Sequence, residues 1–365
     1  MKLIAYQYRF YPNKEQATLL AQTFGCVRFA YNSALGFSKE QYELGNKTNY
    51  NDWSKNLTLM KKNPDYAWLK DVSSVPLQQA LKHLDKGFNA FFKSGFGYPK
   101  FKNKYARQSA SYMSNAFKWD AENKTLVLAK MKQPFKIRWS RSFSGTPSSL
   151  TISKNKAGQY FVSILVKEEV QKLPIASKTI GVDVGIADLA VCSDGRRFNN
   201  PRMTKKYAKK LAKAQRQLAK KKKGSNNFNK QKLVVAKIHE KIASSRQDFT
   251  HKMTKMLINE NQVISVESLR VKNMVKNHKL AKHLHDANFG EMLRQLEYKA
   301  DWYGRKISAV DQWFPSSKMC NACGLLYLGK WTLGIRKWSC SCGAEHDRDH
   351  NAAINIHKEG LRIAA

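Results

Sequence analysis

The stretch TIGVDVGIADLAVC, residues 179–192, indicates the fold class of the second half of this chain. Two apolar arms, residues 179–183 and 188–192, flank a tight connection around Gly185, which predicts a β-hairpin. Asp183 ends the first arm. Because burying a bare carboxylate is expensive, this acid must be paired, exposed at the strand end or bound to a metal ion.

Two further acidic positions repeat this placement. Glu267 lies near the end of a β-type run, residues 262–269, and the cluster of Asp347 and Asp349 immediately precedes a helical segment that begins near residue 352. A carboxylate is favoured at a helix N-terminus. Each acid alone could be a turn former, a surface residue or a helix cap. The order hairpin, strand, helix, with an acid in each, is the pattern of an RNase H-like nuclease fold.

Three acidic side chains of this kind are suited to metal-dependent hydrolysis of a phosphodiester. Hydrolysis of a phosphodiester by two divalent ions requires the ions about 3.5–4 Å apart. Magnesium prefers hard oxygen ligands, which carboxylates from separate segments can supply. The sequence therefore predicts a two-ion Mg²⁺ site, and no comparable Ser/His/Asp pattern is present.

Charge and composition indicate which class of partner this protein binds. The 365 residues contain 65 Lys+Arg and 27 Asp+Glu, a net charge of +38, and 42% hydrophobic residues, enough for real cores. A polyanion, above all nucleic acid, would neutralise such a charge, whereas a small-molecule enzyme gains little from it. No apolar run approaches the roughly 20 residues of a membrane helix, and no signal peptide is evident. We expect a cytoplasmic protein without a membrane partner.

Two segments are candidates for nucleic-acid contact. Residues 202–241 hold 15 Lys/Arg and one acid, Glu240, around an apolar stripe of helical spacing, and residues 224–227 break this helix. A solvated face is the simpler interpretation, but so few compensating acids favour phosphate contact. In residues 91–102 aromatic rings alternate with lysines, which suits base stacking, although the rings could equally pack a core. The candidate residues are Lys205, Lys206, Lys209, Lys210, Arg216, Lys220, Tyr98, Lys100 and Lys102.

Four of the six cysteines form a metal-binding pattern. Cys320 and Cys323 precede Cys340 and Cys342 by 16 intervening residues, which predicts a zinc ribbon. Four thiolates leave no open coordination position, so the zinc would be structural. The second pair has only one intervening residue, and His346 could replace Cys342 as the fourth ligand. The isolated Cys26 and Cys192 are most simply buried apolar residues.

The N-terminal half alternates between two kinds of pattern. Residues 2–11 alternate like a strand, helical spacing runs from residue 13 and again over residues 75–92, and a polar stretch at 46–55 interrupts it. Residues 108–170 are strand-rich. Because strands both precede and follow it, the helical block is expected to be inserted into one β domain, with a linker near 172–178.

These residues together resemble a known family. The segment 181–190, the Val266-Glu267-Ser268-Leu269 run, the four-cysteine ribbon and residues 346–356 are similar to TnpB, the RNA-guided DNA endonuclease of bacterial and archaeal insertion sequences and a relative of type V CRISPR nucleases. The similarity extends over nearly the whole chain and includes residues 2–12, 76–86 and 97–102. The ribbon's shortened second pair and the short C-terminal end depart from the family pattern.

The resemblance implies a multidomain α+β and α/β architecture. A β-barrel-like wedge domain (1–12 and 96–176) would carry an inserted helical recognition domain (13–95). An RNase H-like RuvC nuclease domain (177–312 and 346–365) would carry an inserted zinc ribbon (313–345). By the same resemblance, the catalytic and Mg²⁺-binding acids are Asp183, Glu267 and Asp349. The third acid is Asp349 because the family's acid lies two residues before the Asn of the Asn-Ala-Ala run.

The resemblance also implies the partners. A guide RNA from the transposon end would direct cleavage of double-stranded DNA next to a short transposon-adjacent motif, and a monomer is favoured. One alternative is an RNA-guided repressor that binds without cutting, and another is a strand-transferring transposase. A plain zinc-ribbon transcription factor would leave the three strand-end acids unexplained.

Overall fold

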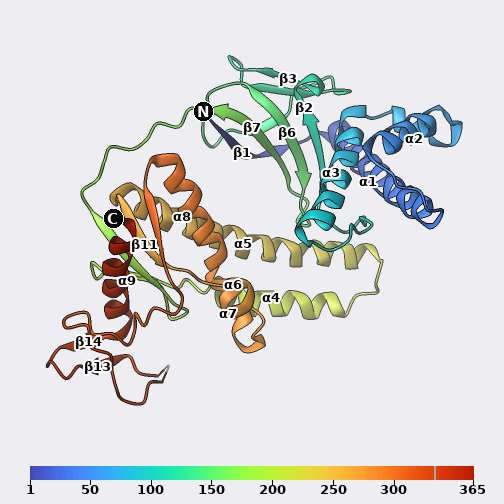
Figure 1. Cartoon of the computed structure of the whole chain (residues 1–365). Coiled ribbons are helices and arrows are strands. Elements are labelled where there is room, and N and C mark those ends of the chain that lie inside the picture. The colour runs from blue at the N-terminus through green and yellow to red at the C-terminus, as the bar shows by residue number, and fades with distance from the viewer. Residues whose placement is uncertain (333) are drawn as a thin grey trace. The chain divides into compact units, whose positions relative to one another are not determined.

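The computed structural model describes residues 1–332 and 334–365 and divides into two compact units, Met1–Glu169 and Val170–Ala365 (Figure 1). The division falls at residues 169–170, slightly before the expected end of the β domain at residue 176. Each unit is described by itself below. Among the described residues, no helix has the length and apolar character needed to cross a membrane.

The first unit is built on a five-stranded antiparallel sheet. Its order is β2-β6-β7-β1-β5, and its strands are β1 (Lys2–Tyr11), β2 (Gln108–Met113), β5 (Lys136–Arg138), β6 (Pro147–Lys154) and β7 (Tyr160–Glu168). The first strand of the chain lies inside this sheet, so the helical block stands in the chain between two strands of one sheet. Strands β2 and β5 form the two edges, so the sheet is open. The resemblance had implied a barrel-like domain, in which the edge strands would pair. A separate hairpin pairs β3 (Phe117–Asp120) with β4 (Thr125–Leu128), after a short 3-10 turn, η2 (Ser114–Ala116).

The inserted block contains α1 (Lys14–Glu43), α2 (Tyr50–Lys62), the 3-10 helix η1 (Pro64–Lys70) and α3 (Ser74–Ser94). The polar stretch at 46–55 was expected to interrupt the helices, yet α2 begins within it. Its N-terminus is fixed by a capping box in which Asn49 and Asp52 bond each other's backbone N–H groups. Trp53 and Leu57 are buried, and the partly buried Tyr50 and Met60 pack against the same core. These four residues have helical spacing, but the polar residues among them led to the expectation of an interruption.

The second unit is built on a mixed sheet of order β10-β9-β8-β11-β12. Its strands are β8 (Thr179–Val184), β9 (Asp188–Cys192), β10 (Arg197–Asn199), β11 (Val263–Glu267) and β12 (Lys306–Val310). Strands β8, β9 and β10 pair antiparallel in sequence, which confirms the predicted hairpin of β8 and β9. Strand β11 pairs parallel with both β8 and β12. Strand β8, which carries Asp183, is therefore central.

Six helices and a small ribbon complete the second unit. The helices are α4 (Met203–Ala219), α5 (Asn226–Glu260), α6 (Val271–Met274), α7 (His278–Ala287), α8 (Phe289–Tyr303) and α9 (Arg348–Ala364). The basic segment forms α4 and the start of α5, and they are separated at the predicted break. The two short strands β13 (Lys337–Ser339) and β14 (Glu345–Asp347) form the ribbon and precede α9.

Two glycines allow α9 to lie directly against the sheet (Figure 1). A Cβ added at Gly181 on β8 would come within 2.2 Å of the Ala353 carbonyl oxygen, and one added at Gly360 on α9 within 2.1 Å of Ser265 Oγ on β11. Backbone therefore approaches backbone where a side chain would hold the helix away. This close packing carries the start of α9 to the strand ends at which Asp183 and Glu267 lie.

Candidate functional site

Three carboxylates lie near one another where the inner strands β8 and β11 end and helix α9 begins. Asp183 is the fifth residue of β8 and Glu267 is the last residue of β11. The parallel register pairs Val182 with Val266. Asp183 and Glu267 are the next residues on these two strands, so they occupy neighbouring positions. Asp349, in the first turn of α9, is the third member. The structure thus brings together the three acids that the sequence singled out from segments more than 80 residues apart.

The electrostatics of Asp183 show how close the acids are. Burial, and after it the charges of Glu267 and Asp349, raise the pKa of Asp183 to about 8. Burial also raises the pKa of Glu267, although a hydrogen bond from Ser316 opposes this. Like charges held together without a compensating cation are unfavourable, and a divalent ion would relieve that repulsion.

Asp347 and Asp349 have different surroundings. Asp347 is the N-cap of α9: its side chain accepts a hydrogen bond from the His350 N–H at 3.0 Å and forms an ion pair with Arg197 at 2.8 Å. Although burial works against it, these contacts lower the pKa of Asp347. The residue pattern alone left both acids as candidates and the resemblance selected Asp349; the structure makes Asp347 the N-cap of α9.

Asp349 faces two guanidinium groups. Arg348 approaches one carboxylate oxygen at 2.7 Å and Arg336 the other at 3.1 Å. The Asp349 side chain is 18% exposed, so it remains reachable from outside. These arginines neutralise one member of the trio while no cation is held by the acids. The sequence analysis did not select either arginine, although Arg348 stands directly between the two candidate acids in the chain.

The cysteine cluster is more tightly closed than the acid cluster. Within the described residues, the Sγ atoms of Cys320, Cys323, Cys340 and Cys342 are the only set of three or more such ligand atoms that all lie within 4.8 Å of one another. Two Sγ–Sγ separations are 3.8 Å and 3.6 Å. Tetrahedral zinc with bonds of about 2.3 Å places its sulfurs roughly 3.8 Å apart, so the thiols fit zinc.

His346 also lies beside this cluster. Its Nε2 is 3.0 Å from the Cys320 sulfur, and its ring is buried against Trp338. With Cys342 already within the four-sulfur set, His346 is placed as a hydrogen-bonding neighbour of Cys320. The cluster could hold zinc with four thiolates alone.

The candidate nucleic-acid residues are on the surface of their own units. Lys205, Lys206, Lys209, Lys210 and Arg216 are exposed along α4, and Lys220 is its exposed C-cap. No ion pair to any of these six occurs in the described part of the chain. The apolar stripe of α4 packs instead on Ile238 and Ile242 of α5. The helix therefore turns its cations toward solvent.

The three aromatic-segment candidates in the first unit are exposed as well. Tyr98 is 39% exposed, and its ring packs edge-on against Phe88 and Phe91. The ammonium of Lys102 lies 3.8 Å from the ring centroid of Tyr31, and Lys100 is exposed. Tyr98 thus combines core packing with an open face, as both interpretations of the segment allowed.

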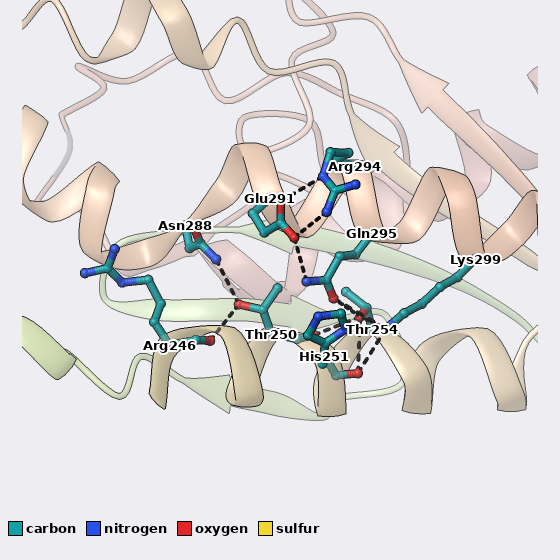
Figure 2. A network of polar contacts seen from close by, with 9 residues as sticks. All are labelled: Arg246, Thr250, His251, Thr254, Asn288, Glu291, Arg294, Gln295 and Lys299. Carbon is teal, nitrogen blue, oxygen red and sulfur yellow. Dashed lines mark hydrogen bonds and ion pairs between the residues drawn. The ribbon is translucent and has the colours of Figure 1, made fainter. Parts of the chain in front are cut away.

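A second buried polar cluster lies between α5 and α8 (Figure 2). Lys299, only 8% exposed, donates to the Thr254 hydroxyl at 2.6 Å, the His251 carbonyl at 3.1 Å and the Gln295 amide oxygen at 3.4 Å. Gln295 in turn donates to Glu291 at 2.9 Å. Burial lowers the pKa of Lys299 to about 8. The sequence analysis did not select this lysine, because nothing in the local pattern distinguishes it from exposed lysines.

Family models match three parts of the chain. One described as "Probable transposase" matches residues 163–278, a Cas12f1-like TNB domain matches residues 289–356, and a helix-turn-helix domain matches residues 1–47. The last stretch contains one strand and one long helix, β1 and α1, and not a pair of short helices joined by a turn.

Similar solved structures and similar sequences together identify the family of this chain. A solved Cas12f1 chain, from a complex with single guide RNA and target DNA, matches with a TM-score of 0.52 and 13% identity over 98% of both chains. A Streptomyces pristinaespiralis protein is 44% identical over 99% of this chain and 90% of its own, and an Escherichia coli K12 protein is 33% identical over 100% and 94%. Both are named, provisionally, as RNA-guided DNA endonucleases. The chain belongs to this TnpB-like family of RNA-guided DNA endonucleases.

Proposed function

We propose that this protein is an RNA-guided endonuclease that cuts double-stranded DNA next to a short flanking motif, with Asp183, Glu267 and Asp349 as its catalytic acids. The observation that carries this proposal is the convergence of these acids, from β8, β11 and α9, with the pKa of Asp183 raised to about 8 by burial and by the other two carboxylates.

The strand order supports an RNase H-like, RuvC-type domain in the second unit. Three antiparallel strands in chain order are followed by two strands that pair parallel on the other side of β8. The acids lie at the ends of the central pair and at the start of the helix that packs on them. The family membership of the whole chain points to the same chemistry.

The donor set fits divalent magnesium. Hard carboxylate oxygens from three separate segments are ligands that Mg²⁺ accepts while keeping several waters. The charges of Glu267 and Asp349 act on Asp183, which supports a shared site for the three carboxylates. When bound, two Mg²⁺ ions would activate the attacking water and stabilise the leaving oxygen.

The chain's own residues hold this site in place. Ser316 donates to Glu267 Oε1 at 3.3 Å and orients that carboxylate. Arg336 and Arg348 hold the Asp349 carboxylate in place, and guanidinium groups at this position could also contact phosphate oxygens of the substrate. With the 3′ oxygen as the leaving group, water attack on phosphorus gives 5′-phosphate and 3′-hydroxyl ends.

Guide RNA is the proposed reader of the target sequence. Base pairing would select the DNA, while exposed cations grip the backbone of the heteroduplex. The candidates for this contact are Lys205, Lys206, Lys209, Lys210, Arg216 and Lys220 of the second unit, and Tyr98, Lys100 and Lys102 of the first. The first unit, with its sheet and inserted helices, would act as wedge and recognition domains that read the flanking motif. The four cysteines would hold a structural zinc ion.

The test uses purified protein with the RNA that copurifies with it. Sequencing this RNA gives the guide, and matched double-stranded DNA with Mg²⁺ is then assayed for cleavage beside Asp183→Ala. Cleavage by the native protein and none by the variant is the expected result. Tight, guide-dependent binding without cleavage by the native protein would instead support a repressor.

A second candidate rests on the match of residues 163–278 to a family described as "Probable transposase". A strand-transferring enzyme would join DNA ends as well as hydrolyse them. A gel of the same reaction separates the outcomes, because joined products are longer than either substrate whereas hydrolysis gives only shorter ones.

A further inference from the structure

Two buried asparagines on α9 hold a loop that reaches both the acid cluster and the cysteine cluster. Asn351 and Asn355 are 1% and 2% exposed and lie one helical turn apart on α9, the helix whose first turn contains Asp349. Residues one turn apart project from the same face of a helix. The loop they face, residues 315–321, follows β12 and ends at Cys320 and Asn321.

The asparagine side chains are bonded to the loop's backbone. The Asn355 amide donates to the carbonyls of Ser316 at 2.8 Å and Met319 at 2.6 Å, and the Asn351 amide donates to the same two carbonyls at 3.3 Å and 2.8 Å. The Asn351 oxygen accepts from the Asn321 backbone N–H at 3.0 Å and from its side chain at 2.9 Å. Buried loop backbone must find such partners, and one face of α9 supplies those of the Ser316 and Met319 carbonyls and of the Asn321 N–H.

The loop carries one contact to each candidate metal centre. Ser316 is 3% exposed and donates to Glu267 at 3.3 Å. At the other end, Cys320 is the thiol adjacent in the chain to both Met319 and Asn321. Asn321 also approaches His346 Nδ1 at 3.4 Å, while the other ring nitrogen of His346 lies 3.0 Å from Cys320 Sγ. A single rigid segment therefore spans the distance between carboxylates and thiols.

We propose that Asn351 and Asn355 are positioning residues that clamp the 315–321 loop, so that Ser316 orients Glu267 for divalent-ion binding and Cys320 is held in the thiol set. This inference rests on the proposed function for the role of Glu267, but not for the role of Cys320. It makes the two asparagines a shared support of both sites: loosening the clamp weakens both metal centres together.

The test measures the two metals separately from cleavage. In Asn351→Ala/Asn355→Ala we expect Mn²⁺ binding to the protein, followed by the electron paramagnetic resonance of the free ion, to weaken by about 10-fold, as for loss of hydrogen bonds that fix a charged ligand. Zinc release to a chromogenic chelator becomes several-fold faster, and the Mg²⁺ concentration for half-maximal cleavage rises in parallel with the Mn²⁺ change. Guide-dependent DNA binding stays within about 2-fold.

Single substitutions keep the test decisive if the double variant does not fold. Ser316→Ala should weaken Mn²⁺ binding several-fold and leave zinc release unchanged, whereas Asn321→Ala should speed zinc release and leave Mn²⁺ binding unchanged. Asn261→Ala is the matched control, because Asn261 is equally buried, donates to the Leu257 carbonyl at 3.0 Å and precedes β11 at the end opposite Glu267.

The proposal is overturned if the folded double variant keeps the Mn²⁺ affinity and zinc-release rate of the Asn261→Ala protein. It is equally overturned if Ser316→Ala and Asn321→Ala change neither quantity. If the variants change Mn²⁺ binding and zinc release as described but the native protein does not cut matched DNA, the proposed function fails while the clamp is upheld.

Discussion

The second unit contains two buried or partly buried polar clusters whose hydrogen bonding differs sharply. Lys299, between α5 and α8, has three oxygen partners, and these belong to residues that are themselves bonded (Figure 2). The three carboxylates lie at the ends of β8 and β11 and the start of α9, and burial together with the charges of Glu267 and Asp349 raises the pKa of Asp183. The first cluster supplies partners for its one charged group, whereas the second holds like charges together that the two arginines on Asp349 offset only in part.

The difference teaches how to separate a structural polar cluster from a functional one. A satisfied network stabilises one arrangement of helices, and a cluster of like charges stores unfavourable energy until a ligand arrives. We therefore expect substitutions in the acid cluster to change activity more than stability, and substitutions at Lys299 to do the reverse. The predictions below test this contrast, from the largest effect to the smallest.

Asp183→Asn should abolish cleavage while keeping the fold. Loss of one acid from a two-ion site is expected to slow cleavage by on the order of 10³-fold or more, about 4 kcal/mol in barrier height. Guided DNA binding should be unchanged, as measured by gel shift beside a cleavage time course. The exposed Asp194→Asn serves as the control for removing one acid. Substantial cleavage by Asp183→Asn would remove the acid cluster from the mechanism.

Gly181→Ala should break the geometry of the acid cluster without touching its charges. The added Cβ meets the Ala353 carbonyl oxygen of α9 at 2.2 Å, so the helix must move, at a cost of about 3 kcal/mol in the free energy of unfolding. Urea denaturation measures this loss. Gly290→Ala in α8 meets only Val271 at 4.0 Å and should leave stability unchanged or slightly raised. Equal stabilities of the two variants would show that α9 does not depend on this close approach.

Lys299→Met should alter how the free energy of unfolding depends on pH and should leave cleavage unchanged. Because the pKa of Lys299 is lowered to about 8 in the folded protein, the unfolded chain binds more protons between pH 8 and about 10.5. This lysine therefore makes the free energy of unfolding rise with pH in that window, by at most about 1.4 kcal/mol per pH unit, and contributes no slope below it. The methionine variant should lack this slope.

The measurement is the difference in unfolding free energy between native protein and Lys299→Met at pH 8 and pH 10. Exposed Lys237→Met on α5 is the control, and its difference from the native protein should stay constant with pH. A pH-independent difference for Lys299→Met, or loss of cleavage at neutral pH in a folded variant, would contradict the contrast.

Lys209→Ala/Lys210→Ala should give the smallest effect, confined to the surface. Removing two phosphate contacts is expected to lower the slope of log affinity against log salt by about 1.8 for duplex nucleic acid. Lys252→Ala is a suitable control because Lys252 is already paired with Asp248 at 2.7 Å. An unchanged slope in the double variant would argue against α4 as a backbone contact.

The local elements that carry the site were predictable from sequence. The hairpin around Gly185, the strand ending at Glu267 and the helix after Asp347 all follow from apolar periodicity and flanking turns, and all three are present. Helix α2 was missed because the polar residues at 46–55 obscured the helical spacing of its apolar face, Tyr50, Trp53, Leu57 and Met60. Open edges at β2 and β5 were also not visible, because strand pairing is a long-range property.

The sequence by itself determined which residue types stand at the strand ends and in the cysteine ribbon, because hydrophobic period, turn chemistry and ligand spacing are local. Only the tertiary structure decided that Asp347 caps α9 and pairs with Arg197, and that Lys299 is buried whereas most lysines are exposed. It also decided that Asn351 and Asn355 grip the 315–321 loop. The physical reason is that the pKa of a side chain depends on neighbours distant in the chain, which only the packing of α9 and α8 on their partners brings into place.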